Sequence, residues 1–256
     1  MVRLYRSPHF RGLVPPVLLL ILWWLATTYQ WVNSSVLVPF EQLYHSALNP
    51  ELQQSLLTGL EASFTRLLEG SAIGIGAGLV LGIALGLSSL VDRMIGPSFH
   101  AARQVAIFAW IPLLTAWFGN GDICKVVFVA LAAFYPVVMG TYEGIRSVPH
   151  SYLEVGRALC FSRVQMLRRI ILPSAAPSIV TSLQLAFIFS WFAAVGAEYV
   201  IGKMSTGIGS VVMAAQENLQ PDVVLLGVIL ISLVGILMNK ILRQIPRYLF
   251  RWRDAA

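Results

Sequence analysis

Long apolar runs alternate with short polar stretches along most of this chain. Six of the runs approach the roughly 20 residues that an α-helix needs to cross the hydrocarbon layer of a membrane. The predicted spans cover residues 13–32, 66–90, 104–118, 123–144, 178–199 and 223–238. The pattern therefore predicts an all-α, polytopic membrane protein with about six transmembrane helices.

The first apolar run predicts an uncleaved helix rather than a signal peptide. Trp23, Trp24 and Trp31 are typical of anchoring at a membrane interface, and no cleavage motif of small residues follows them. The next segment, residues 33–60, holds acidic residues but no Lys or Arg. That composition favours the outer side of the membrane.

Five glycines in the second predicted span are spaced four residues apart. They are Gly70, Gly74, Gly78, Gly82 and Gly86. The spacing places them on one helix face, where missing side chains let a neighbouring backbone come close. The pattern predicts tight helix packing, and a face that slides during transport stays open as a second interpretation.

The stretch between the second and third predicted spans, residues 91–103, predicts a short basic loop. Two of the later spans then contain a proline. Pro112 in the third predicts a kink, because proline removes a backbone hydrogen bond, and the fourth contains Pro136.

Composition excludes a second, soluble catalytic domain. The 256 residues are 57% hydrophobic and 12% charged, whereas roughly a quarter of a soluble domain is charged. The net charge of +6 does not indicate nucleic-acid binding, because the basic residues flank the apolar runs. All of the 18 lysines and arginines except Arg66, Lys125 and Lys203 fall on one side of a six-span topology. The excess of positive charge predicts that this side, with both termini, is cytoplasmic.

A polar stretch at residues 145–173 separates two of the apolar runs. Five arginines and a single acid, Glu154, lie between Arg146 and Arg169. The sequence predicts two short helices joined near residues 160–162, the second ending before Pro173, which cannot extend a running helix. We expect a charged elbow of this kind to form a surface that a partner binds.

This stretch resembles the cytoplasmic coupling loop of permeases of ATP-binding-cassette (ABC) importers. The family pattern has an acid, two small residues, three variable residues, a glycine, nine residues and Ile-x-Leu-Pro. The residues that fall on this loop pattern are Glu154, Val155, Gly156, Arg157, Ala158, Cys160, Ile170, Leu172 and Pro173. Val155 replaces an alanine and Cys160 replaces the glycine. Because cysteine tolerates positive φ less well than glycine, we expect the bend to be built differently.

The resemblance extends over residues 59–243, which are similar to the type-1 transmembrane domain of the nitrate/sulfonate/taurine branch. It is carried by Arg103, residues 109–113, 117–119 and 142–146, Ala197 with Glu198, and residues 207–209 and 222–224. It implies an N-terminal segment at 1–58 and a basic tail at 244–256. The branch often has prolines shortly after the position of Arg103, where this chain has Gln104, Ala106 and Ile107.

The resemblance also implies partners and a function. Two permease copies, by default identical, would enclose a path in the bacterial inner membrane, in contact with lipid. Two separate ABC ATPase subunits would use ATP, and an extracytoplasmic solute-binding protein would deliver the solute. The chain itself would bind no cofactor or nucleic acid and would not be an enzyme. An aliphatic sulfonate or taurine is the expected solute, while nitrate, bicarbonate and vitamin precursors stay open.

Several charged residues have two interpretations. Glu154 would contact an ATPase or cap its own helix, where an acid contributes roughly 0.3–1 kcal/mol. The loop arginines would hold lipid phosphates or an ATPase. Glu198 would be an interfacial acid that fixes a helix end, or a residue of a gate or path, since ionised acids in a membrane usually face protein or water.

A secondary transporter or an intramembrane enzyme is the competing class. A secondary transporter is expected to show paired repeats with broken helices, and no convincing pair is found. An enzyme would need catalytic or metal-binding groups within the spans, but His9, His45, His100 and His150 all lie outside the apolar runs. The two cysteines, Cys124 and Cys160, predict neither a disulfide nor a metal site.

Overall fold

The structure is a computed structural model that describes residues 8–29, 31, 37–201 and 206–249. Within these residues the regular elements are helices and no strand occurs, which confirms the predicted all-α fold. Four helical stretches are long and apolar enough to cross a membrane. They are α3 (Pro50–Leu87), α6 (Asp122–Arg146), the continuous stretch Arg163–Ile201 that includes α9 (Leu172–Ile201), and Pro221–Pro246, which begins with α11 (Pro221–Leu242).

By length and composition the described chain has four or five candidate spans, where the sequence predicted about six. A fifth span exists only if two helices joined by a sharp bend count as one, and the described apolar part of α1 (Pro8–Thr28) is the shorter stretch Val14–Thr28. The bend lies between Ala102 and Ile107, at the start of the predicted third span, so that span is the second arm of a bent pair of helices.

The supposed loop before that bend is a helix. α4 (Ser89–Ala102) begins where the Ser88 side chain accepts a hydrogen bond from the Val91 amide at 3.4 Å. After Arg103 the chain turns by 96° and continues as the 3₁₀ helix η2 (Ile107–Trp110) and α5 (Ile111–Phe118).

The two prolines of this region behave differently. Pro112 lies in the first turn of α5, where the missing N–H is not needed, so it starts a helix instead of kinking one. The prediction of a kink at Pro112 is therefore wrong. Pro136 does lie inside α6, as predicted.

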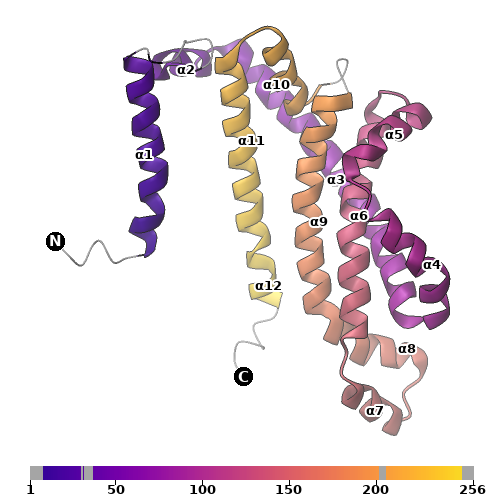
Figure 1. Cartoon of the computed structure of the whole chain (residues 1–256). Coiled ribbons are helices and arrows are strands. Elements are labelled where there is room, and N and C mark those ends of the chain that lie inside the picture. Colours follow the sequence, from indigo (N-terminus) through magenta and orange to yellow (C-terminus); the bar gives the residue numbers. More distant parts are fainter. Residues whose placement is uncertain (1–7, 30, 32–36, 202–205, 250–256) are drawn as a thin grey trace.

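The centre of the fold is the group formed by α3, α6 and α9, with α6 in contact with both other helices (Figure 1). Gly70 and Gly86 of α3 lie beside Val129 and Ile145 of α6, so these two helices run in the same direction. Small residues also mediate contact with α9, because a Cβ on Gly140 would lie 2.6 Å from the Ser182 hydroxyl. These close approaches follow from the small residues along α6 and its neighbours.

The remaining helices surround this centre. α1 stands apart and is joined to the bundle through α2 (Phe40–Ala47), which crosses the top of the view in Figure 1. α10 (Ile208–Glu217) lies at that same upper end, beside the start of α11. α7 (His150–Ala158) and α8 (Arg163–Met166) project beyond the bundle at the opposite end. The large apolar side chains of α1 and α11 are widely exposed, as expected of surfaces that face lipid.

Candidate functional site

The elbow formed by α7 and α8 contains most of the loop residues singled out from the sequence. α7 ends in a Schellman motif: the Cys160 amide donates to the Arg157 carbonyl at 2.9 Å and the Phe161 amide to the Gly156 carbonyl at 3.0 Å. Cys160 takes φ +53°, in the left-handed region that glycine usually occupies. The expectation of a differently built bend is therefore wrong, because Cys160 itself adopts the glycine-like conformation.

α8 begins directly after this turn with a capping box. The Ser162 hydroxyl accepts from the Gln165 amide at 3.3 Å, and the Gln165 side chain accepts from the Ser162 amide at 2.9 Å. We predicted that this helix ends before Pro173, and that is wrong. The helix continues through the π-helix η3 (Leu167–Ile171) into α9. A wider π turn relieves the clash between a proline ring and the carbonyl of the preceding turn. The second arm of the elbow thus continues into α9 without a break in the helix.

Gly156 allows the two arms of the elbow to pack closely. A Cβ at this position would lie 2.6 Å from Ile170 Cδ1 and 2.7 Å from Met166 Sδ. Of the other predicted loop residues, Leu172 is half-buried, and the rest are exposed. The exposed residues are Glu154, Val155, Arg157, Ala158, Cys160 and Pro173. The loop therefore divides into an internal contact and an outward surface.

The outward surface is both apolar and basic. Tyr152, Val155, Leu159 and Val164 keep between 55% and 61% of their surface exposed. The Arg169 guanidinium lies over a ring of the same elbow, 5.6 Å from the centroid of Phe161. Exposed apolar side chains gathered on one surface are typical of sites that contact another protein or a membrane.

The base of the elbow is tied to α4. Arg146, the last residue of α6, forms an ion pair with Asp92 at 2.9 Å and donates a hydrogen bond to the Tyr142 hydroxyl at 2.8 Å. Its guanidinium also lies over the Tyr142 ring, 5.0 Å from the centroid. α4 and α6 are therefore connected where the elbow leaves the bundle.

The five predicted packing glycines all lie on the face of α3 that meets α6. A Cβ on Gly70 would lie 2.6 Å from the Val129 Cβ, and a Cβ on Gly74 would meet the Ala130 carbonyl and lie 2.8 Å from the Ala133 Cβ. The corresponding contacts of Gly78, Gly82 and Gly86 are with Val137, Thr141 and Ile145. By contrast, Gly76, on another face of α3, has open space around it.

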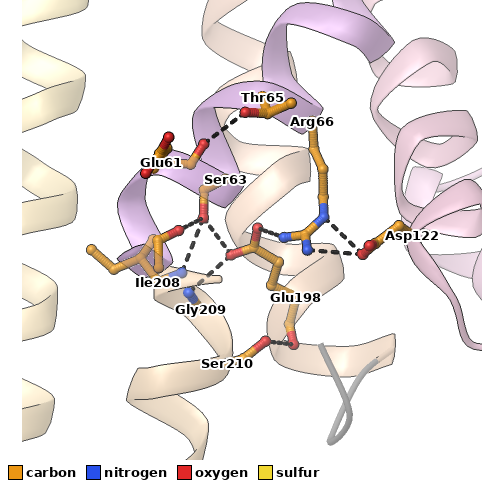
Figure 2. A network of polar contacts seen from close by, with 10 residues as sticks. Glu61, Ser63, Thr65, Arg66, Asp122, Glu198, Ile208, Gly209 and Ser210 are labelled. Carbon is orange, nitrogen blue, oxygen red and sulfur yellow. Dashed lines mark hydrogen bonds and ion pairs between the residues drawn. The ribbon is translucent and has the colours of Figure 1, made fainter. Parts of the chain in front are cut away.

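Glu198 is the centre of a buried polar network at the opposite end of the bundle from the elbow (Figure 2). One carboxylate oxygen accepts from the Ser63 hydroxyl at 2.7 Å and from the Gly209 amide at 3.0 Å. The other accepts from the Arg66 guanidinium at 2.6 Å, and Arg66 also forms an ion pair with Asp122 at 2.8 Å. The network therefore joins α3, α6, α9 and α10.

Glycine also makes room for this carboxylate. A Cβ on Gly207 would lie 2.7 Å from the Glu198 Oε1 atom. Glu198 is fully buried within the protein, and it bonds the last turns of α9 to α3 and to the start of α10.

The sequence interpretation missed the rest of this network: Ser63 and Arg66, which bond Glu198, and Asp122, which pairs with Arg66. The signal was present, because an arginine and an acid that both fall within apolar runs are costly unless they pair. In the part of the chain that the structure describes, no group of three or more His, Cys, Asp or Glu side chains could hold a metal ion. The polar groups gathered here are arranged to bond helices together.

Comparison with known proteins gives concordant results. Residues 74–252 match the family described as binding-protein-dependent transport system inner membrane component. The chain is 32% identical over 250 residues to the putative aliphatic sulfonates transport permease protein SsuC of Bacillus subtilis, covering 98% of this chain and 90% of the relative. It is 34% identical over 239 residues to the taurine transport system permease protein TauC of Escherichia coli, covering 91% of this chain and 86% of the relative.

A solved structure has the same fold. The chain is similar to a structure of inward-facing conformations of the MetNI methionine ABC transporter, with a TM-score of 0.62 and 18% identity. The similarity covers 77% of this chain and 99% of that one.

Proposed function

Since this chain belongs to the family of binding-protein-dependent transport inner-membrane components, in the nitrate/sulfonate/taurine branch of ABC importer permeases, we propose that it forms the translocation path for a small organic anion. An aliphatic sulfonate or taurine is the proposed solute, because relatives over nearly the whole chain carry those names. Nitrate, bicarbonate and a vitamin precursor are the alternatives within the branch. The protein is a multi-pass component of the bacterial inner membrane, and family members are transport permeases.

The elbow is the proposed attachment point for two ABC ATPase subunits on the cytoplasmic side. The observation that carries this is its exposed apolar and basic surface, placed beyond the bundle and continuous with α9. ATP-driven closure of the ATPases would push on α7, and the push would reach the bundle through α9 and through the α4–α6 connection at Arg146. For this coupling the ATPases must bind two permease conformations with different free energy.

The opposite end, with α10, is the proposed face for an extracytoplasmic solute-binding protein. The elbow and α12 (Gln244–Leu249) both lie away from α10 (Figure 1). This arrangement agrees with a cytoplasmic elbow and the predicted cytoplasmic termini on one side and α10 on the other. A second, identical permease copy would complete the path.

Purification from native membranes tests the proposal directly. Tagged chain would be isolated in mild detergent and its associated proteins identified by mass. We expect an ABC ATPase in stoichiometric amount. Recovery of the chain alone, under conditions in which a known importer stays intact, would contradict it and favour an ion-coupled transporter, whose uptake would collapse with the proton or sodium gradient.

The solute needs its own test. ATP-dependent uptake of labelled alkanesulfonate or taurine by the assembled importer is the expected result. Undiminished growth on sulfonate as the sole sulfur source after deletion of the gene would remove the solute assignment and leave the permease assignment in place.

A further inference from the structure

A cavity of about 600 Å³ lies at the break between α4 and η2, against the central parts of α6 and α9. Its lining includes Ala132 and Met139 of α6 and Phe189 and Ala193 of α9, residues that are far from both ends of their helices. Irregular backbone at this depth is tolerated in a membrane only where it is buried in protein or lines a water-filled cavity. The 96° break therefore has the position expected of a solute path.

The polar groups of this cavity suit an anion. Arg103 and Gln104 line it at the break, and Tyr135 lines it from α6. Within the residues that the structure describes, the Arg103 guanidinium and the Tyr135 hydroxyl have no hydrogen-bond or ion-pair partner, and no acidic side chain lines the cavity. The Gln104 side-chain amide donates to the His100 carbonyl at 3.2 Å, which leaves its second N–H free.

Arg103 is exposed, so its guanidinium is open to a ligand that occupies the cavity. Among the described residues it has no acidic partner, so an anion in the cavity would supply its counter-charge. A guanidinium also presents a planar fork of donors that matches the oxygens of an anion such as a sulfonate. Arg66, which is buried in the bundle, already has two acids as partners, whereas the exposed Arg103 has none in the described chain.

The rest of the cavity wall is apolar and aromatic. Phe108, Phe189 and Phe192 line it together with Ala132 and Met139. Apolar walls contribute roughly 25 cal/mol for each Å² of ligand surface that they remove from water. Nitrate and bicarbonate have no apolar part to gain from such walls, whereas an alkanesulfonate has both a charged head and a hydrocarbon chain.

A second cavity of about 420 Å³ continues the first towards the elbow. The two share Pro136 and Met139, and the second is lined further by Ser178 and Thr181 of α9 and by Glu143 near the cytoplasmic end of α6. An anion that left Arg103 in this direction would pass hydroxyl groups and then meet a like charge at Glu143. Transport requires a low affinity at the exit, since a solute that binds too tightly does not leave.

We propose that the cavity at the α4–η2 break is the permease's own binding site for the solute, and that it selects an anion with an aliphatic chain. Arg103, assisted by Gln104 and Tyr135, binds the sulfonate head, and the three phenylalanines contact the chain. This inference rests on the proposed import function and deepens it, because it locates part of the solute selectivity in the permease.

The test uses the complete importer, with ATPases and binding protein, in proteoliposomes. Arg103→Gln is compared with Arg93→Gln, which removes an exposed arginine of α4 that does not line the cavity. We expect Arg103→Gln to lower the uptake of labelled alkanesulfonate at least about tenfold, because a charge-assisted bond is lost. Arg93→Gln should stay within about twofold of wild type. Both variants should assemble with the ATPases.

Two further variants separate binding from a mere loss of structure. Arg103→Lys keeps the charge and is expected to retain more uptake than Arg103→Gln. Phe192→Ala shortens the apolar wall and is expected to reduce uptake of longer alkanesulfonates more than that of methanesulfonate.

The inference would be overturned if Arg103→Gln took up alkanesulfonate at the wild-type level and Phe192→Ala left the chain-length profile unchanged. The proposed import function would not be affected by that result. Equal loss in Arg103→Lys and Arg103→Gln, both assembled, would also contradict a role for the charge. An importer that moves nitrate or bicarbonate but no sulfonate, even in wild type, would refute the proposed solute and this site's selectivity together. Absence of ATP-dependent uptake of any solute would instead mark failure of the import function.

Discussion

The two ends of the bundle hold their charged side chains in opposite ways. At the end near α10, Glu198 and Arg66 are buried and bonded to each other, with Asp122 as a third member. At the elbow, Arg157 and Arg163 are exposed, and neither forms an ion pair among the residues that the structure describes. One end satisfies its charges within the chain, whereas the other leaves them for a partner.

This difference predicts two kinds of mutant. Changes near Glu198 should affect the stability of the isolated chain, because a buried ion that loses its partner is strongly destabilising. Changes on the exposed side of α7 should leave the chain stable and affect its assembly, because surface charges contribute little to folding. The comparison fails if the two phenotypes are exchanged or mixed.

The largest effect is expected from Glu198→Ala. The substitution leaves the buried Arg66 guanidinium with Asp122 alone, whose side chain is 63% exposed. Loss of one member of a buried ion pair typically costs about 3–5 kcal/mol, so we expect a much lower unfolding temperature of the purified chain in detergent. Glu69→Gln, which changes an exposed acid of α3, is the control and should stay within about 0.5 kcal/mol.

A double variant sharpens this result. Arg66→Met combined with Glu198→Leu removes both buried charges and should recover part of the stability that Glu198→Ala loses. If Glu198→Ala instead unfolded at the same temperature as Glu69→Gln, the network would not hold the helices together, and the contrast between the two ends would not stand.

A smaller loss of stability is expected from Gly74→Ala in the middle of the bundle. The new Cβ would press on the Ala130 carbonyl and on the Ala133 Cβ, and overpacking of this kind costs about 1–3 kcal/mol. Gly76→Ala is the matched control, since its Cβ would meet open space and alanine favours a helix by up to about 1 kcal/mol. Thermal unfolding should move in opposite directions for the two variants, and equal shifts would mean that the packing face is not specific.

The sequence was sufficient for the parts of the fold that have a periodic signal. The all-α class follows from the apolar runs, and the four-residue spacing of Gly70 to Gly86 places these residues on one face of α3. The helix α4 and the bend after it did not follow. Basic and polar residues at 91–103 suggested a loop, although α4 forms there and stops at Arg103.

The partners of Glu198 could not be read from spacing. Ser63 and Arg66 lie 135 and 132 residues away in the chain, and only tertiary packing decides which buried charges meet. The prediction for the bend at Cys160 was wrong for a different reason. Propensity disfavours positive φ for cysteine, but the hydrogen bonds of the Schellman motif and the packing of Gly156 on Ile170 outweigh that cost.

Glu154→Arg tests the elbow side of the comparison. The residue is exposed on α7, so the change should not alter insertion or the unfolding temperature of the chain. We expect the recovery of the ATPase with tagged chain to fall about tenfold, which corresponds to roughly 1.4 kcal/mol of binding free energy. Ser151→Arg, a second exposed position of α7 that lies outside the matched loop pattern, is the control. Normal recovery and normal uptake of Glu154→Arg would argue against docking through this residue.

The smallest effect is expected from Cys160→Gly, and it should be a gain. The left-handed conformation at φ +53° costs a residue with a side chain roughly 1–2 kcal/mol, whereas glycine adopts it freely. Glycine also increases the entropy of the unfolded chain by roughly 0.5–1 kcal/mol, so the net gain is on the order of 0.5–1 kcal/mol. Slower hydrogen exchange of the Phe161 amide, which donates to Gly156, would report this local gain. Ala158→Gly, within α7, should speed the same exchange, and a faster rate in Cys160→Gly would show that the bend does not rest on this conformation.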